Sequence, residues 1–488
     1  MGSGGVPQGF LSLWLLFPLL WSGYATPTYH LSNVLSIIEE LEGQDTGMTI
    51  LNVTAILRSL QTSDQDFRRL LLGEVPAPVD LSGLLSQAKE SILREVMNHE
   101  VGRLVERGVV LTPDGTTVAM GNLVAGVEAG LKREVRSPRS GADADLWAPV
   151  DSLCALTLAK DLGLAFLAHQ ANKNQEMLAS DGCWDDVDLP RVFTRTGPWT
   201  LATSALVNGG MDGFILGDHL AQHPPPLPRL SALLRDYYSQ APGLLPLKAR
   251  SRRMNFKATF DLGNFTGQVL GAISLYDQLR NNSVLGDLER NTFRKICEQG
   301  VKLFHQNYLD CPAIIPRCMW GARPFKGEPI QLALPLHFVY IHHTYTPSQP
   351  CTNFPDCAAN MRSIQNFHQD DRQWNDIGYS FLVGSDGYMY EGRGWHWLGA
   401  HTKGQNSKGY GVGFIGNYSS ELPEPTALAL VRDSFTRCAV AGGKITSDYA
   451  IQGHRQYRAT SCPGNALFSE ITTWEAFKEV DGQGSKHR

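Results

Sequence analysis

Two histidines and a cysteine in the last third of the chain have side chains that suit a transition metal. His342 lies near the end of the run LHFVYIHHT, and His454 and Cys462 both lie in GHRQYRATSC. Two imidazoles and one thiolate form a borderline-soft donor set that suits Zn²⁺, with a fourth tetrahedral position left open, as a hydrolytic centre requires. Residue types alone leave another interpretation open, in which the histidines are packed or exposed and Cys462 forms a disulfide.

The spacing does not show which of the adjacent residues His342 and His343 would face the metal. Successive side chains of a strand point to opposite faces, so only one of the pair can look into a given cleft. His454 and Cys462 lie eight residues apart without a short CxxC-type repeat, so the local pattern indicates no known metal finger.

The segments that must position these residues predict an α/β region. Strands are expected at Leu336–Ile341, Ser380–Gly384, Gly387–Glu391 and Gly411–Gly416, and helices at Cys357–Asp370, Ala427–Ala441 and Asn465–Val480. Such an order within roughly 170 residues predicts one mixed sheet with helices on its faces.

The preceding region, from about His30 to Gln306, has a mostly helical pattern. Apolar residues at i, i+3, i+4 and i+7 from Val34 to Leu41 predict a helix capped by Ser32 or Asn33. A second helical stripe covers Leu84–Val105, with Asp80 or Ser82 as its cap. Within Val109–Met120, the sequence Pro-Asp-Gly at 113–115 could turn a short hairpin. No repeat or catalytic motif stands out here, so the sequence leaves open whether this region binds a partner or is a structural appendage.

Composition limits the class of protein. The 488 residues suggest two or three domain-sized units, and 42% hydrophobic with 19% charged residues excludes wholesale disorder, collagen and coiled coil. The net charge of −5 provides no overall electrostatic reason to bind nucleic acid or an anionic membrane.

The first residues predict secretion. Phe10–Trp21 is an apolar run of signal-peptide length, and small residues precede a cleavage point after Ala25. A membrane anchor is the alternative, but the run is too short to span a bilayer and contains Pro18. The most apolar later segment, Leu153–Ala168, is interrupted by Lys160 and Asp161, as in a buried globular helix. We therefore expect an extracellular protein without stable membrane insertion.

Secretion changes the interpretation of the cysteines. An oxidising compartment would pair them, and an odd number, nine, leaves at least one as a free thiol, an intermolecular bridge or a metal ligand. Cys351 and Cys357 enclose five residues and suggest a local staple. Four glycosylation sequons are consistent with secretion, although such tripeptides also arise by chance: Asn52, Asn264, Asn281 and Asn417.

The segment from Cys311 to about Phe477 resembles the peptidoglycan recognition protein family, which is related to phage-type zinc amidases. The resemblance rests on ordered blocks: PRCMWGARP, VYIHHT, CTNFPDC, DIGYSFLVGSDGYMYEGRGW, GAH, GVGFIGNY and GHRQ…SCPG. The long N-terminal region with its signal peptide further resembles the long, secreted amidase members of that family.

The resemblance implies a metal site and two disulfides. It places one Zn²⁺ per chain on His342, the first of the adjacent pair, with His454 and Cys462. Family members that only bind peptidoglycan typically carry a non-ligand residue at the position of Cys462. The implied disulfides are Cys311–Cys438 and Cys351–Cys357, and four cysteines remain unassigned: Cys154, Cys183, Cys297 and Cys318.

The resemblance also implies roles around the metal. Tyr379 matches the catalytic tyrosine, which would hydrogen-bond a developing oxyanion, although it could simply pack. Thr460 stands where phage relatives have an assisting lysine. Substrate contacts are expected from Thr344, Arg393, Gly394, Trp395, His401 and Lys408. Trp395 and Trp397 could instead be core residues, and His368 is interpreted as a core histidine.

Together these features predict a secreted zinc hydrolase that cleaves the amide between N-acetylmuramic acid and L-alanine of bacterial peptidoglycan and its muramyl peptides, in scavenging and innate immunity. The alternative is a peptidoglycan-binding recognition protein without turnover, and a third possibility is a catalytic part held back by the helical region. The expected divisions are a signal peptide at 1–25, a helical region at 26–306, an amidase domain at 307–480 and a polar tail at 481–488.

Overall fold

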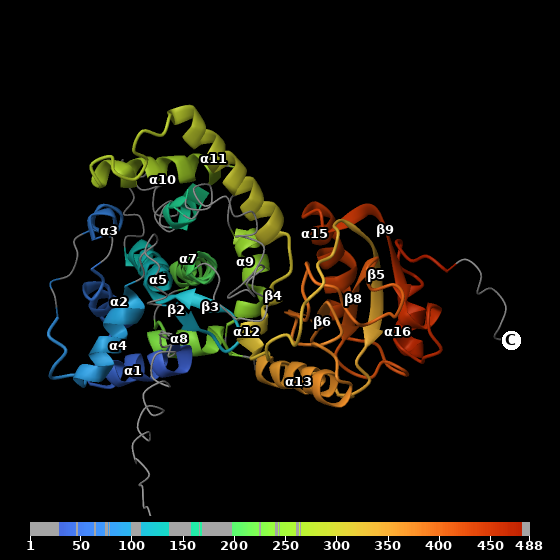
Figure 1. Cartoon of the computed structure of the whole chain (residues 1–488). Coiled ribbons are helices and arrows are strands. Elements are labelled where there is room, and N and C mark those ends of the chain that lie inside the picture. Colours follow the sequence, from blue (N-terminus) through green and yellow to red (C-terminus); the bar gives the residue numbers. More distant parts are fainter. Residues whose placement is uncertain are drawn as a thin grey trace, which may run out of the picture.

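The computed structural model contains a helical N-terminal half and a C-terminal half built on a mixed sheet (Figure 1). It describes residues 29–480 except 45–46, 63–64, 74–76, 78, 99–108, 136–157, 165, 168–197, 224–225, 240–242, 244, 260–262 and 264. The expected signal peptide, Cys154, Cys183 and Asn264 therefore lie outside the described residues, as does the side chain of Cys318. One large core uses residues between Leu31 and Leu309, and two further cores use residues between Ile314 and Trp474.

Helices dominate the N-terminal half and surround a small three-stranded sheet. Its main elements are β1 (Tyr29–His30), α1 (Leu31–Gly43), α2 (Ile50–Ser59), α3 (Gln65–Leu72), α4 (Gln87–Met97), β2 (Val109–Leu111), β3 (Thr117–Ala119), α5 (Met120–Val135), α7 (Pro198–Gln222), α8 (Leu230–Tyr237), α9 (Arg252–Thr259), α10 (Phe265–Leu279) and α11 (Arg290–Leu303). None of the described helices is both long and apolar enough to cross a membrane.

The first predicted helices exist, but their starts differ from expectation. The stripe from Val34 to Leu41 is buried in α1 as predicted, whereas the helix already begins at Leu31 and His30 is the cap residue, so caps at Ser32 or Asn33 are wrong. Helix α4 spans Gln87–Met97 within the predicted 84–105 stripe and has Ser86 as its cap residue, while positions 99–105 of the stripe lie outside the described residues. The Asp80 carboxylate accepts instead from the Ser82 amide, forming a turn ahead of the helix.

The predicted hairpin at 109–120 is confirmed, since β2 and β3 pair antiparallel with Val110 opposite Val118. Behind it, α5 crosses α7 through facing glycines. A Cβ added to Gly130 would lie 2.0 Å from the Gly217 carbonyl oxygen, and one on Gly126 would lie 2.2 Å from the Gly213 backbone. Only glycine allows two helix backbones to approach this closely.

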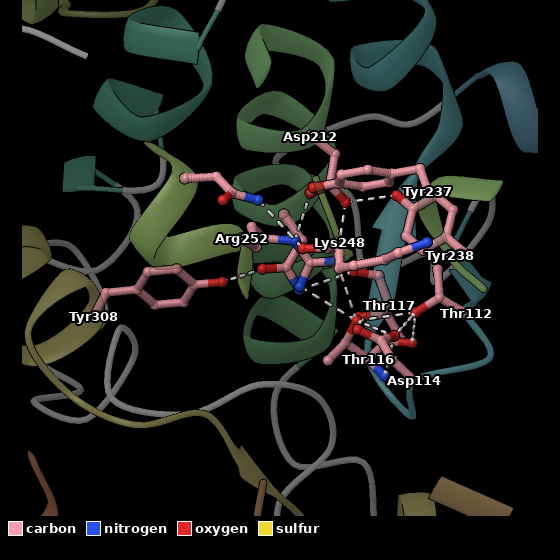
Figure 2. Close-up of polar contacts among 12 residues, drawn as sticks. Thr112, Asp114, Thr116, Thr117, Asp212, Tyr237, Tyr238, Lys248, Arg252 and Tyr308 are labelled. Carbon is pink, nitrogen blue, oxygen red and sulfur yellow. Dashed lines mark hydrogen bonds and ion pairs between the residues drawn. The ribbon is translucent and has the colours of Figure 1, made fainter. Parts of the chain in front are cut away.

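A buried polar network fixes this hairpin to the surrounding helices (Figure 2). Arg252 from α9 pairs with both carboxylate oxygens of Asp212 on α7, at 2.7 and 2.9 Å. The hydroxyls of Tyr237 and Tyr238 donate to the same carboxylate. Arg252 also reaches the Thr116 hydroxyl at 3.3 Å, so the ion pair extends to the hairpin turn. Because Arg252 and Asp212 are paired and hydrogen-bonded, their mutual attraction offsets part of the desolvation cost of burying both charges.

The C-terminal half contains a six-stranded sheet of order β4-β7-β6-β8-β5-β9. The strands are β4 (Ile314–Ile315), β5 (Leu336–His343), β6 (Phe381–Val383), β7 (Met389–Glu391), β8 (Gly409–Phe414) and β9 (Ile445–Gly453). All neighbouring pairs are parallel except β6 and β7, which form the expected hairpin about Ser385–Gly387. The predicted fold class, a mixed sheet preceded by a helical region, is confirmed.

Helices cover both faces of this sheet. Side chains alternate, so Phe381 and Val383 join the core formed with α14 (Pro425–Ala429), α15 (Thr436–Ala441) and α16 (Asn465–Ile471). Leu382 joins the opposite core, formed with α13 (Phe354–Asn366). The last helix ends at Ile471 rather than at 480, and a bridge between Ile451 and Phe477 follows it. Both expected disulfides, Cys311–Cys438 and Cys351–Cys357, are confirmed.

Candidate active site

The ends of two parallel strands place the two histidines of the candidate metal site together. Strands β5 and β9 pair with Ile341 opposite Gly453, which brings together the residues that come next in the chain, His342 in β5 and His454 directly after β9. Their ring centroids lie 4.5 Å apart. Carboxyl ends of parallel strands are a common place for functional side chains, because loops leave the sheet there.

Cys462 completes a group of three donors. Its Sγ lies 3.6 Å from Nδ1 of His342, and the ligand atoms of the three residues lie within 4.8 Å of one another. Two ligands held at 2.0–2.3 Å by a tetrahedral Zn²⁺ are themselves roughly 3.3–3.6 Å apart. The borderline-soft donor set and this spacing therefore fit the metal.

Burial keeps these donors neutral in the absence of a cation. Desolvation lowers the pKa of His342 well below its ordinary value and that of His454 to about 4. Burial likewise raises the pKa of the Cys462 thiol to about 12. A bound metal cation would stabilise the Cys462 thiolate and offset the desolvation that raises its pKa, because metal binding displaces the thiol proton.

His343, the second histidine of the pair, is placed differently. Its Nδ1 accepts a hydrogen bond from the Tyr418 amide at 3.1 Å, and it does not belong to the three-donor group. His343 also contributes to the pocket lining, where its backbone carbonyl oxygen lies near Cys462 Sγ and the Tyr379 hydroxyl. Of the adjacent pair, His342 is the one that belongs to the three-donor group among the described residues.

A pocket of about 350 Å³ opens beside the three donors. Tyr379 lines it with its ring 5.4 Å from that of His342, and its hydroxyl donates weakly to the His343 carbonyl oxygen at 3.4 Å. Burial raises the pKa of Tyr379, so its hydroxyl stays protonated at neutral pH. Thr460 lies on the exposed rim, and its hydroxyl accepts from the Cys462 amide at 3.2 Å.

The expected substrate-binding residues divide into two groups. Thr344 and His401 line the pocket, although the Thr344 hydroxyl is already hydrogen-bonded to backbone groups of Gly416. The other four do not line it: Arg393, Gly394, Trp395 and Lys408.

Packing explains why these four lie elsewhere. Arg393 is buried and donates to the carbonyl oxygens of Ile377 and Leu398, both at 2.7 Å. Trp395 stacks on Phe435 inside the core, and Gly394 provides the left-handed turn beside it. Lys408 precedes β8, at the opposite end of the sheet from His342, where its carbonyl oxygen accepts from the Phe338 amide.

Sequence reasoning missed two aromatic residues of the pocket. His368 is buried, as expected, but it also lines the pocket, and its ring stacks on Trp374 with 4.7 Å between centroids. Its Nδ1 accepts from the Gly378 amide, and burial lowers its pKa to about 4, so the neutral ring carries its proton on Nε2. Trp374 is 36% exposed. An aromatic residue in the polar run QDDRQWND was the available signal.

Comparison with known proteins places this chain among enzymes of one family. Residues 332–465 match the N-acetylmuramoyl-L-alanine amidase family. The chain is 40% identical to N-acetylmuramoyl-L-alanine amidase of Mus musculus, over 96% of this chain and 99% of that protein. It is 39% identical to the protein of that name from Homo sapiens, over 95% and 94% of the two chains. This chain belongs to that amidase family.

Shorter peptidoglycan recognition proteins match about a third of this chain. Peptidoglycan-recognition protein LB of Drosophila melanogaster is 43% identical over 34% of this chain and 71% of its own length. A solved structure of peptidoglycan recognition protein-LE in complex with tracheal cytotoxin is 42% identical, covers 34% of this chain and 96% of that one, and has a TM-score of 0.33. The long amidase relatives thus match nearly the whole chain, whereas the shorter recognition proteins match about a third of it.

Proposed function

We propose that this protein is a secreted zinc hydrolase that cleaves the amide between N-acetylmuramic acid and L-alanine in bacterial peptidoglycan and muramyl peptides. Its biological role would be scavenging and innate immune defence. The observation that carries the proposal is the His342, His454 and Cys462 group beside a pocket. Near full-length relatives named for this activity support it. We further propose 307–480 as the amidase domain and 1–25 as its signal peptide.

The three donors would hold one Zn²⁺ through His342 Nδ1, a nitrogen of His454 and Cys462 Sγ. When bound, zinc supplies Lewis-acid polarisation of a carbonyl and an acidified water, which are the two requirements for hydrolysing an unactivated amide. The protein's part is to hold the three donors close together, with His342 and Cys462 buried, so that little reorganisation is needed on binding.

Tyr379 would act on the substrate's carbonyl oxygen. Its phenol stays protonated because burial raises its pKa, and its present hydrogen bond to the His343 carbonyl is long at 3.4 Å. The hydroxyl can therefore exchange this weak bond for a stronger one to an oxyanion developing in the pocket. No carboxylate lines the pocket among the described residues, so a carboxylate base from the pocket wall is not part of this proposal.

The pocket rim would bind the sugar and the peptide stem. Trp374 offers an exposed aromatic face, against which the apolar face of a sugar ring can stack. His368 carries a proton on Nε2 that can be donated to a substrate oxygen, because its Nδ1 is engaged by Gly378. His401 also lines the pocket. We propose these three residues as substrate contacts in place of Arg393 and Trp395.

Secretion would expose the sequons to glycosylation. Asn281 is exposed in the turn after α10, whereas the Asn52 and Asn417 side chains are engaged in local hydrogen bonds with Thr49 and Ser419. We propose Asn281 as the most accessible acceptor of these three.

The experiment that tests the function measures new L-alanine amino termini released from a muramyl peptide by the full chain. We expect release that a chelator abolishes and that added Zn²⁺ restores. The first variant is Cys462→Ser, which removes the thiolate and should reduce release to the level seen with chelator. The matched control is Cys297→Ser, which changes a buried free cysteine of the helical half, far from the candidate ligands, and should leave release intact.

Two results would contradict the proposal. Full turnover by Cys462→Ser would show that the zinc assignment is wrong. If wild-type protein binds the muramyl peptide without releasing L-alanine termini, the protein is a recognition protein without turnover.

A further inference from the structure

A buried threonine contacts the side of His342 that faces away from Cys462. Nδ1 of His342 faces Cys462 Sγ at 3.6 Å, while Nε2 lies 3.2 Å from the hydroxyl of Thr402. The same hydroxyl lies 3.2 Å from Nδ1 of His401. Thr402 has no exposed surface, and His342 and His401 are 1% and 7% exposed, so water does not compete for these contacts.

The loop between β7 and β8 holds Thr402 in place. Asn406 accepts hydrogen bonds from the amides of both His401 and Thr402, at 3.1 and 2.7 Å, through one side-chain oxygen. The Gln405 amide donates to the Thr402 carbonyl oxygen at 2.9 Å. These bonds fix the backbone on either side of the hydroxyl, so its position does not depend on a bound ligand.

The position of the proton on a neutral imidazole decides which atom donates in the two hydrogen bonds of Thr402. A neutral imidazole carries one proton, so a His342 that presents a lone pair at Nδ1 must carry its proton on Nε2. That proton is donated to the Thr402 oxygen, and the threonine's own proton is then available for His401 Nδ1. His401 consequently carries its proton on Nε2, an atom that is buried without a hydrogen-bond partner in the described part of the chain.

We propose that Thr402 is a positioning residue that sets the tautomer and the ring orientation of His342 for metal binding. Through the same hydroxyl it orients the ring of His401, which lines the pocket. The inference rests on the zinc site proposed above. Metal-binding histidines usually donate their second ring nitrogen to an acceptor, and loss of that acceptor weakens metal affinity about 10–100-fold.

The test compares zinc affinity of the full chain and its variants by competition with a chromogenic chelator. Thr402→Val keeps the shape and removes the hydroxyl, so its Kd for Zn²⁺ should rise about 10–100-fold. Thr402→Ser keeps the hydroxyl and should remain within roughly threefold of wild type, by the same argument. The control is Thr436→Val, another buried threonine in the sheet half, whose hydroxyl donates to the Arg432 carbonyl oxygen away from the pocket. It should leave zinc affinity unchanged.

Distinct outcomes separate this inference from the proposed function. A Thr402→Val protein that binds zinc as tightly as wild type would overturn the role of Thr402 and leave the zinc site standing. Equal losses in Thr402→Val and Thr402→Ser would assign the effect to packing and would also overturn it. Wild-type protein that binds no zinc would overturn the site itself. Thermal unfolding of each metal-free variant identifies any that fails to fold, and in that case the Thr402→Ser comparison decides.

Discussion

At the scale of single residues, the site depends on which atoms burial leaves available. His342 and His454 keep free lone pairs because burial holds their pKa values low. Burial also favours the neutral form of Tyr379 by raising its pKa. The neutral phenol keeps its proton and is therefore a hydrogen-bond donor. Burial therefore prepares both metal ligands and a hydrogen-bond donor before any substrate arrives.

The first residue-scale prediction concerns Tyr379. Tyr379→Phe should retain zinc and lower kcat by roughly 10²–10³, the effect of removing one oxyanion donor. Steady-state kinetics of L-alanine release, with zinc content measured on the same protein, check this. Tyr449→Phe, a change outside the pocket lining, is the control. An unchanged kcat would leave Tyr379 with a packing role only.

The second residue-scale prediction contrasts two tryptophans. Trp374→Ala should weaken muramyl-peptide binding about tenfold, equivalent to 1.4 kcal/mol, with little effect on stability, because Trp374 is partly exposed at the pocket. Trp395→Ala should instead lower the free energy of unfolding by about 3–5 kcal/mol, because this ring is buried between Phe381 and Phe435. Calorimetric titration measures the binding affinity of both variants, and denaturant unfolding measures their stability. If Trp374→Ala destabilised the fold and Trp395→Ala weakened only the binding, the placement of these rings would be contradicted.

At the scale of elements, the hairpin of β6 and β7 connects the site to the N-terminal half. Tyr379 precedes β6, and at the far end of the hairpin the turn contains buried Asp386. The Asp386 carboxylate accepts from the Tyr390 hydroxyl at 2.5 Å and from the Tyr388 amide at 3.2 Å. Burial raises its pKa to about 6, and the nearby carboxylate of Asp114 adds to the rise.

This raised pKa predicts a pH dependence of stability. A folded-state pKa of about 6 exceeds the ordinary value of 3.8, so the folded state binds the proton more tightly. The stability that this group contributes is complete below pH 3.8 and is lost as the pH rises through 6. Asp386→Asn is neutral at every pH. Between pH 4.5 and 7, the variant should therefore gain about 2 kcal/mol in unfolding free energy relative to wild type.

Denaturant unfolding of both proteins at the two pH values measures that difference. Parallel pH profiles for wild type and Asp386→Asn would contradict the raised pKa. If Asp386→Asn instead lost stability relative to wild type as the pH rose from 4.5 to 7, the fold would favour the charged form of this carboxylate over the neutral form.

At the scale of the whole molecule, the N-terminal hairpin contacts the sheet half directly. The Tyr388 hydroxyl donates to the Asp114 carboxylate at 2.7 Å, and both groups are buried. The ring of Phe354 also packs so closely on Gly115 that a Cβ there would lie 2.4 Å from it. Asp114 in turn contacts Thr116, which Arg252 reaches from the helical core (Figure 2). A continuous set of polar contacts thus joins the two halves.

A double-mutant cycle tests this connection. Asp114→Ala and Tyr388→Phe should each destabilise the full chain, and their combined effect should fall short of the sum by about 1.5–3 kcal/mol, the range for a hydrogen bond to a charged group. Asp114→Ala combined with Tyr449→Phe should be additive, because these two residues do not touch. Additivity in the first pair would show that the contact does not join the halves energetically.

The sequence by itself determined the chemistry of the candidate site and much of its support. Donor types indicated a possible zinc site made by His454, Cys462 and one of two adjacent histidines, and the family resemblance selected His342. Turn residues predicted the hairpin at 113–115. These are properties of residue types and of nearby residues, which a sequence displays directly. The order of blocks from Cys311 onward also carried the family resemblance and, with it, the two disulfides.

Tertiary structure alone decided which residues meet. The register of β5 on β9 placed His342 beside His454, and packing buried Trp395 while leaving Trp374 at the pocket. The fold also brought the Thr402 hydroxyl to Nε2 of His342 and the Asp114 carboxylate to the Tyr388 hydroxyl, although these residues are far apart in sequence. Such contacts arise from how strands pair and cores fill, so the local pattern around each residue contains no record of its distant partner.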